Sequence, residues 1–210
     1  MTFIPLDPAT WPRMPYFYYF TKIAPTSFSI TQTLDVGPVR ERAHALGLRF
    51  FPLYLYAASH VIAEMPELRL ARVDGQLGHY DLLHPNYTLI RPDHSMLAAW
   101  TLYTPNFSEF YHRFLDDEAV AMQVAAGPVG KADAPVNSFA CGMLPWLHFD
   151  SYTPMPQNGL PNFAPVLQAG RYQDERMPVS LTVAHAVADG YHAAQFFTRL
   201  QTMFNEPDWL

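Results

Sequence analysis

A histidine and an aspartate stand four residues apart in AHAVADG, which spans residues 184–190. This segment joins an apolar run, PVSLTV, to an amphipathic run, YHAAQFFTRLQ. An imidazole at the end of a strand can present one ring nitrogen to a cleft, and histidine ordinarily titrates near neutral pH, so it can take a proton from a substrate. His185 is therefore a candidate general base, with Asp189 at the entry to the next helix.

The same residues have less demanding interpretations. Aspartate is a common N-cap of helices, and a histidine in an apolar segment is often a core residue whose hydrogen bonds are satisfied within the protein. A metal site is disfavoured, because His185, Asp189 and His192 would form an unusual ligand set and no cluster of Cys and His residues supports one. We therefore expect no metal.

Hydrophobic periodicity predicts the elements that position these residues. Strands are expected at 27–36, 87–92, 95–103, 139–144, 147–153, 163–172 and 178–185. Helices are expected at 37–46, 51–65, 107–125 and from about Asp189 to Met203. Asp74 and Gly75 suit the positive φ angles of a tight turn, which predicts a hairpin over 68–83. Mixed strands and helices indicate an α/β fold, a sheet covered by helices on one side.

Composition narrows the class of protein. The chain has 210 residues, of which 50% are hydrophobic, enough for a substantial core, and we expect a single domain over 1–210. The formal net charge is −6 and the basic residues are scattered, so we expect no nucleic-acid partner. The longest apolar run is too short to span a bilayer, which predicts no membrane partner. A single cysteine, Cys141, and an N-terminus without signal-peptide features favour the cytoplasm.

An ordered set of motifs resembles the chloramphenicol acetyltransferase family. The HxxxDG pattern of residues 185–190 follows LPWLHFDSY and FAPVLQAGRY, and further matches are TWPR at 10–13, SFSIT at 27–31, RFFP at 49–52, ELR at 67–69 and HPNYTL at 84–89. HxxxD alone is shared with dihydrolipoyl and plant acyltransferases, so the ordered set carries the resemblance. It implies a CoA-dependent acyltransferase fold, a two-layer α/β sandwich with a mixed sheet covered by helices. It also implies acetyl-CoA-dependent O-acetylation of chloramphenicol or a similar small hydroxylated acceptor, and with it a role in antibiotic resistance.

The resemblance also implies roles for the residues around His185. His185 would take the proton from the acceptor hydroxyl, which attacks the thioester of acetyl-CoA directly, with no covalent enzyme intermediate. A hydrogen bond at its other ring nitrogen would fix the imidazole. Asp189 would pair with an arginine near the N-terminus, here Arg13, and so hold the His185 segment in place. Without the resemblance, Arg13 is simply a surface charge.

Four residues match positions that contact coenzyme A in the family. Arg49 and Arg171 stand where the family has two lysines near the 3′-phosphate, and a guanidinium suits phosphate well. Tyr172 and Trp146 match aromatic residues near the coenzyme. Each of the four, taken alone, fits a surface cation or a packing aromatic, so the expectation rests on the set.

The acceptor side departs from the family pattern. The family's oxyanion-stabilising serine is Gly142 here, and the nearest Ser and Cys along the chain are Ser138 and Cys141. Losing such a donor typically costs about 10²–10³ in rate. The position before His185, a histidine in the family, is Ala184. The acceptor pocket is expected to be lined by Tyr19, Phe20, Met96, Tyr152, Pro154 and Gln168, several of which differ from the usual family residues.

Two functional interpretations therefore stay open. The first is acetyl transfer by a homotrimer whose active sites lie between subunits, as the resemblance implies. The alternative is a relative that uses a different acceptor, or that binds coenzyme A or a small aromatic ligand without turnover, which the glycine at position 142 and the altered pocket favour. A third interpretation, a core cut from a larger synthase, is disfavoured by the chain length and by the lack of a carrier-domain linker.

Overall fold

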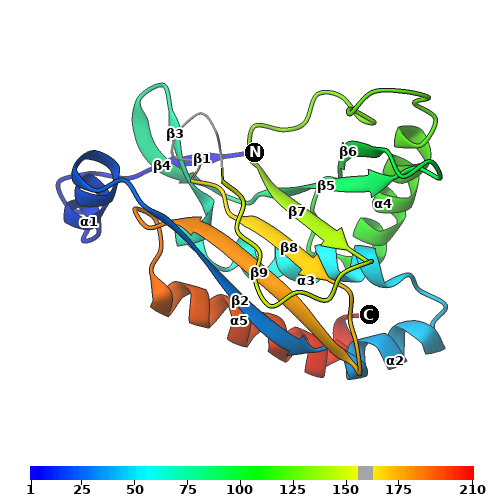
Figure 1. The fold of residues 1–210 in the computed structure, drawn as a ribbon. Coiled ribbons are helices and arrows are strands. Elements are labelled where there is room, and N and C mark those ends of the chain that lie inside the picture. Colours follow the sequence, from blue (N-terminus) through cyan, green and yellow to red (C-terminus); the bar gives the residue numbers. More distant parts are fainter. Residues whose placement is uncertain (156–162) are drawn as a thin grey trace.

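The computed structural model describes residues 1–155 and 163–210. Its strands form a six-stranded sheet in the order β2-β9-β8-β7-β5-β6 and a three-stranded sheet in the order β1-β4-β3 (Figure 1). The strands of the large sheet are β2 (Ser27–Asp35), β5 (His84–Ile90), β6 (Met96–Trp100), β7 (Ser138–Leu144), β8 (Val166–Gly170) and β9 (Arg176–Ala184). Those of the small sheet are β1 (Phe3–Pro5), β3 (Leu70–Val73) and β4 (Gln76–Tyr80).

The helices are α1 (Met14–Tyr18), α2 (Gly37–Ala45), α3 (Phe50–Ala63), α4 (Phe107–Ala121) and α5 (Gly190–Asn205). The described residues also form a π-helical turn, η1 (Tyr19–Ile23), and two 3₁₀ turns, η2 (Pro66–Arg69) and η3 (Pro207–Trp209). The large sheet is mixed: β7 runs parallel to β5 and β8, and the remaining strand pairs of the sheet, β2–β9, β8–β9 and β5–β6, are antiparallel. The predicted α/β class and mixed sheet are confirmed.

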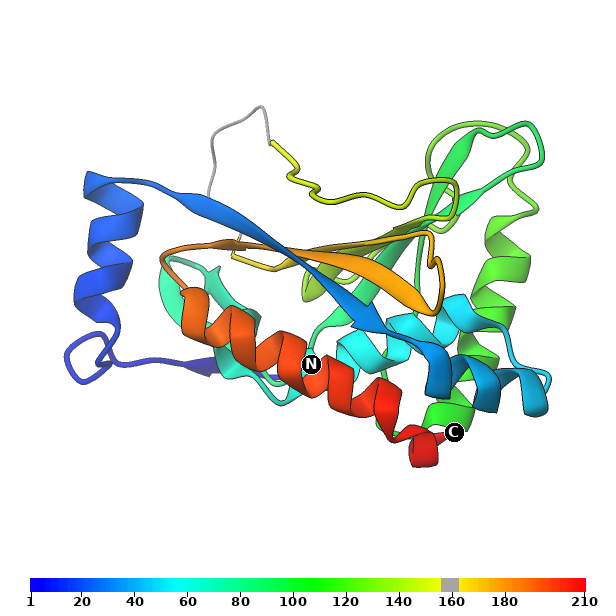
Figure 2. The same ribbon diagram turned by 60° about the horizontal axis from the view of Figure 1, so that its bottom comes forward.

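Helices α2, α3 and α5 cover one face of the large sheet (Figure 2). The chain after β7 crosses the opposite face, which we call the open face. Helices α1 and η1 stand at the far end of β2, away from the other helices (Figures 1 and 2). The helical layer on one side of the sheet agrees with the predicted two-layer arrangement.

The sequence explains why α5 docks on the sheet. Asp189 caps the helix, with its carboxylate accepting the Tyr191 backbone N–H at 3.1 Å. The apolar residues of the helix recur at helical spacing and are buried. They are Ala193, Phe196, Phe197, Leu200 and Phe204. The sheet and this apolar face thus bury one another and fix the position where α5 begins, directly after His185.

The hairpin turn was predicted correctly and one strand was not. Asp74 and Gly75 both have positive φ, 49° and 81°, as the turn requires. Residues 147–153 form no strand. Both edges of β8 are occupied by β7 and β9, so this segment has no free sheet edge beside it. It crosses the open face instead, where the Ser180 hydroxyl donates to the Tyr152 carbonyl at 2.7 Å.

Candidate active site

His185 lies one residue beyond the end of β9. Its backbone N–H donates to the Thr26 carbonyl at 2.9 Å, which continues the pairing of β9 with β2. Its ring stacks on Phe20, with centroids 3.8 Å apart and planes within 6°, and Phe28 meets it edge-on at 5.1 Å. Two aromatic side chains from different elements therefore orient the imidazole.

The expected hydrogen bond to the imidazole does not form among the described residues. Nδ1 of His185 is buried and has no hydrogen-bond partner among residues 1–155 and 163–210. The expectation that this bond fixes the ring was wrong for the chain as described, and the aromatic contacts with Phe20 and Phe28 hold the ring instead. Nε2 is left as the ring nitrogen that can face a reacting group.

Arg13 holds the backbone at His185 and at the residue that follows it. Its guanidinium donates to the carbonyls of His185 at 3.0 Å and Ala186 at 3.3 Å, and to the Asp189 carboxylate at 2.9 Å. The Arg13 side chain is only 15% exposed. One side chain 172 residues from His185 in sequence thus fixes the turn that carries the imidazole.

Asp189 joins this turn to α5. Besides capping the helix and pairing with Arg13, it accepts a hydrogen bond from His192 at 2.8 Å. Burial opposes its ionisation, but the hydrogen bonds from Arg13 and His192 outweigh that effect and lower the pKa of Asp189 to about 2. Asp189 is therefore a carboxylate at neutral pH. Asp189 therefore has both of the roles that the sequence suggested: it caps α5 and it forms the ion pair with Arg13.

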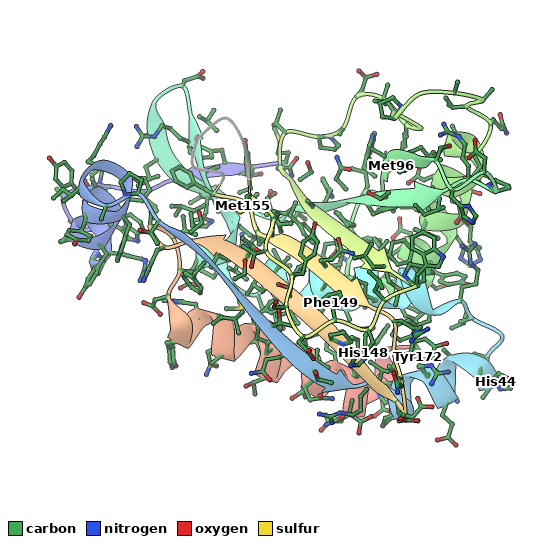
Figure 3. The ribbon with its side chains drawn as sticks, viewed as in Figure 1. His44, Met96, His148, Phe149, Met155 and Tyr172 are labelled. Carbon is green, nitrogen blue, oxygen red and sulfur yellow. The ribbon has the colours of Figure 1, made fainter. Side chains whose placement is uncertain are left out.

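The residues expected near the acceptor divide into separate groups. Tyr19 and Phe20 lie on η1, and Phe20 contacts His185. Gln168 lies on β8 opposite Ser180, and the Ser180 hydroxyl holds Tyr152 two residues before Pro154. Met96 lies on the edge strand β6, apart from Phe149 on the open face (Figure 3).

These groups do not meet within one chain. Gln168 pairs with Ser180, and His185 is five residues further along the same strand direction. At about 3.3 Å per residue, this separation is roughly 16 Å. Gly142 pairs with Gln168 across β7 and β8, so it is remote from His185 as well. Gln168 and Gly142 therefore lie towards the middle of the sheet, whereas His185 stands just beyond the end of β9, beside Phe20.

The four residues expected near coenzyme A gather at one end of the sheet. Phe50, next to Arg49, meets the Tyr172 ring edge-on at 5.9 Å. The backbone N–H of Arg171 donates to the Leu147 carbonyl at 2.6 Å, which places Arg171 beside Trp146, the residue before Leu147.

Their present contacts differ from one another. Arg49 is held by Glu118, to which both terminal nitrogens of its guanidinium donate. Within the described residues Arg171 forms no ion pair. The Arg40 guanidinium lies 3.7 Å from the Tyr172 ring centroid. Of the two arginines expected near coenzyme A, Arg171 rather than Arg49 therefore has the guanidinium that is more available to a ligand.

Sequence reasoning missed Phe28 and Arg40. Phe28 belongs to a correctly predicted strand, but its contact with His185 follows from the pairing of Phe28 with Val183. Arg40 contacts Tyr172 because α2 lies beside the turn after β8. The helix containing Arg40 was predicted, but nothing in the spacing of its residues indicates that contact.

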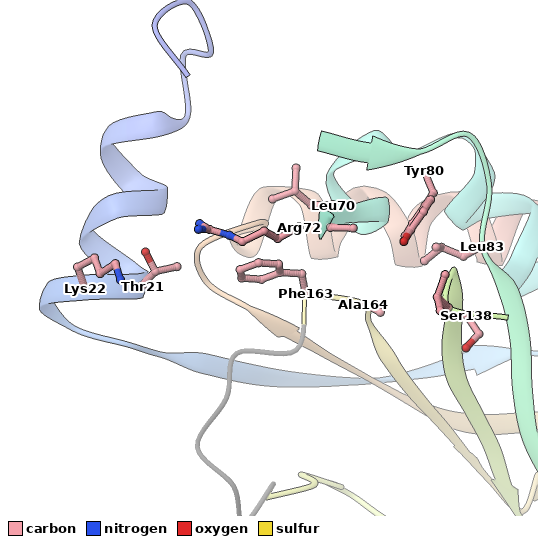
Figure 4. Close-up of a pocket in the computed structure, with 11 residues that line it drawn as sticks. Thr21, Lys22, Leu70, Arg72, Tyr80, Leu83, Ser138, Phe163 and Ala164 are labelled. Carbon is pink, nitrogen blue, oxygen red and sulfur yellow. The ribbon is translucent and has the colours of Figure 1, made fainter. Parts of the chain in front are cut away.

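A cavity of about 630 Å³ lies between η1, the β3–β4 hairpin and the start of β7 (Figure 4). It contains Lys22 and Arg72 but neither His185 nor any residue expected in the acceptor pocket. No group of three or more His, Cys, Asp or Glu residues in the described chain is placed to hold a metal ion. The described helices include none long and apolar enough to cross a membrane.

Comparisons with known proteins agree on one family. The family model described as chloramphenicol acetyltransferase matches residues 1–201. A chloramphenicol acetyltransferase of Vibrio anguillarum is 32% identical over 96% of this chain and 94% of its own length. Chloramphenicol acetyltransferase 2 of Escherichia coli is 31% identical over 97% of both chains.

Solved structures show a similar fold. A chloramphenicol acetyltransferase superposes with a TM-score of 0.81 at 25% identity, covering 97% of this chain and all of that one. A dihydrolipoamide acetyltransferase of Azotobacter vinelandii has a TM-score of 0.64 at 19% identity, covering 87% of this chain and 82% of that chain. The second likeness bears on the fold alone.

Proposed function

The chain belongs to the chloramphenicol acetyltransferase family and is an acyltransferase, and from this premise we propose that it transfers an acetyl group from acetyl-CoA to a hydroxyl of chloramphenicol or a similar small acceptor. One observation carries the proposal. Arg13 and Asp189 hold the His185 turn, and two aromatic rings orient its imidazole with Nδ1 buried. Such a rigid imidazole suits a general base.

In the proposed reaction, Nε2 of His185 removes the proton of the acceptor hydroxyl. The hydroxyl oxygen bonds to the thioester carbonyl carbon, and the carbonyl oxygen takes the negative charge. When the carbonyl re-forms, the C–S bond breaks, and the imidazolium returns its proton to the sulfur of coenzyme A. The acceptor ester and free coenzyme A leave, and the enzyme ends as it began, so no metal or covalent intermediate is needed.

Arg13 and Asp189 serve this reaction as positioning residues. Arg13 contacts the backbone carbonyl of His185 at 3.0 Å rather than its ring. Asp189 stays ionised, because its hydrogen bonds hold its pKa at about 2, and it keeps Arg13 in place across the pH range where a histidine acts as a base. The pair fixes geometry and does not relay the proton.

Coenzyme A would bind at the end of the sheet that carries Arg49, Arg171, Tyr172 and Trp146. Arg171 forms no ion pair within the described chain, and Trp146 is 51% exposed, so both can meet a ligand. Arg49 must share its guanidinium between Glu118 and the phosphate, or exchange one for the other. Arg171→Ala should therefore raise the KM for acetyl-CoA more than Arg49→Ala does.

The separation of the candidate groups supports an active site between subunits of a homotrimer. His185 stands roughly 16 Å from Gln168 along β9, too far for one acceptor to touch both within a chain. Beside His185, α1 and η1 expose large apolar side chains, which a second copy would cover. They are Tyr16, Tyr18, Tyr19 and Ile23. His185 of one subunit would then complete the acceptor site of the next.

Co-expression of two variants with different tags tests this arrangement. One chain carries His185→Ala, and the other carries Gly142→Phe, which blocks the acceptor side. In trimers that retain both tags, one of the three interfaces combines an intact His185 with an intact Gly142, so about a third of the wild-type rate should return. No recovery in such trimers would contradict the shared site.

Product identification tests the chemistry. We expect mass spectrometry to show acetylated chloramphenicol, or an acetylated analogue from a panel of small hydroxylated acceptors, with the wild-type protein and acetyl-CoA. His185→Ala should form no product while keeping its melting temperature and its affinity for coenzyme A. A wild-type protein that binds coenzyme A and acetylates no member of the panel would contradict the proposal. Expression in a chloramphenicol-sensitive host would test the proposed cytoplasmic role in resistance.

A further inference from the structure

Gly142 and Gln168 form a matched pair on neighbouring strands. Strands β7 and β8 are parallel, and their register places these two residues opposite each other. A Cβ atom built on Gly142 would lie 2.6 Å from Oε1 and 3.2 Å from Nε2 of Gln168. The first of these distances is shorter than packed atoms tolerate, so a side chain at position 142 would displace the Gln168 carboxamide from its present place.

The carboxamide lies on the open face of the sheet. Phe139 and Cys141 of β7 are buried, and side chains alternate along a strand, so Gly142 faces the opposite side. Gln168 pairs with Ser180, whose hydroxyl holds the Tyr152 carbonyl at 2.7 Å. The carboxamide therefore borders the segment expected to line the acceptor pocket.

Gln168 keeps unused hydrogen-bonding capacity at this place. A carboxamide has two N–H donors. Nε2 of Gln168 donates to the Ala169 carbonyl across a long 3.3 Å, and the described residues provide it with no other partner. One N–H is therefore free to meet a bound molecule on the open face.

Other candidate donors near Gly142 are badly placed. The Cys141 side chain is buried on the helix-covered face, and burial raises the pKa of its thiol to about 12. Ser138 lies four residues earlier on β7, roughly 13 Å away along the strand. Neither side chain can reach the space beside Gly142, whereas the Gln168 carboxamide fills it.

We propose that the side-chain N–H of Gln168 donates a hydrogen bond to the thioester carbonyl oxygen as that oxygen becomes negatively charged. This inference rests on the proposed function, in which the acceptor oxygen bonds to the carbonyl carbon and His185 of another subunit takes the proton. The hydrogen bond strengthens as charge develops and weakens when the C–S bond breaks, so it favours the transition state over the bound substrate. Gly142 is then the small residue that makes room for this donor.

Gln168→Met tests the donor while keeping a side chain of similar length. We expect kcat to fall about 10²- to 10³-fold, with the KM for acetyl-CoA nearly unchanged, because the bond is made mainly in the transition state. Melting temperature and coenzyme A affinity, measured on the same samples, should match the wild type. A folded Gln168→Met protein with wild-type kcat would overturn the inference and leave the proposed function standing.

The pairing of the two positions gives a second, independent test. Gly142→Ser alone should lose activity, because its Cβ would push the Gln168 carboxamide away from the position where it donates. Gly142→Ser combined with Gln168→Thr removes the collision and supplies a hydroxyl donor, so its kcat should exceed that of either single variant. A double variant no better than Gln168→Thr would contradict the exchange of one donor for the other. If the wild type itself releases no coenzyme A with any acceptor, both the proposed function and this inference fail.

Discussion

Replacement of Arg13 by methionine should loosen the His185 turn and slow the reaction. Methionine keeps an apolar stem of similar reach but loses all three contacts of the guanidinium, at 2.9, 3.0 and 3.3 Å. The two carbonyl bonds are worth about 1 kcal/mol each. The ion pair adds less than about 1 kcal/mol, because the Asp189 side chain is 38% exposed and solvent screens it.

The expected loss of unfolding free energy is therefore about 2–3 kcal/mol. For a chain of this size it corresponds to a fall of roughly 5–10 °C in melting temperature. We expect kcat to fall at least about 10-fold, because the carbonyl of His185 is no longer held. Differential scanning calorimetry and coenzyme A release, measured on one preparation, would give both quantities.

Arg199→Met is a matched control. Arg199 also pairs with a carboxylate, Glu64 at 3.0 Å, but both side chains are more than 40% exposed. Its loss should cost less than about 1 kcal/mol and leave kcat unchanged. Equal melting temperatures for Arg13→Met and Arg199→Met would refute the argument that Arg13 supports the turn.

Three further changes probe the site and its scaffold. Phe20→Leu removes the ring stacked on His185 and should lower kcat about 5-fold, since an aromatic pair contributes about 1 kcal/mol; an unchanged kcat would contradict that role. Thr101→Val removes the hydrogen-bond partner of the buried Tyr87 hydroxyl, which lies 2.8 Å from the Thr101 oxygen. The free energy of unfolding, measured by urea titration, should fall by about 2 kcal/mol; an unchanged value would show that this hydrogen bond does not stabilise the fold. Burial lowers the pKa of His84 to about 4. Between pH 6.5 and 4 the histidine is therefore protonated in the unfolded chain but not in the folded one, and the free energy of unfolding should fall by about 3 kcal/mol as the pH drops through this range. His84→Asn keeps an acceptor for the backbone N–H that His84 binds at 2.9 Å and should flatten this dependence; a slope equal to that of the wild type would contradict it.

Periodicity in the sequence predicted the principal elements because each buries one apolar face. Strand β2, helix α3 and helix α5 follow this rule, and the Asp74-Gly75 turn follows from backbone sterics. The strand predicted at 147–153 was wrong, because alternation also occurs in a segment that lies across a sheet. Periodicity shows which residues face a surface, and it does not show whether a sheet edge is free to pair.

The site was predicted in part, through motifs rather than through periodicity. The ordered motifs singled out Arg13 and Asp189, which form an ion pair in the structure. The stacking of Phe20 on His185 and the contact of Gln168 with Gly142 were not predicted. Both depend on which elements become neighbours and in what register, and a single sequence does not contain that information locally.

The initial rate of thiol release from acetyl-CoA, with and without chloramphenicol, tests the role of His185 directly. Wild-type protein would be compared with His185→Ala and with His44→Ala, which removes an exposed histidine of α2, at the opposite end of β2 from His185. We expect acceptor-dependent release by wild type and His44→Ala, and none above background by His185→Ala. Equal release by His185→Ala and wild type would contradict the assignment of His185 as the general base.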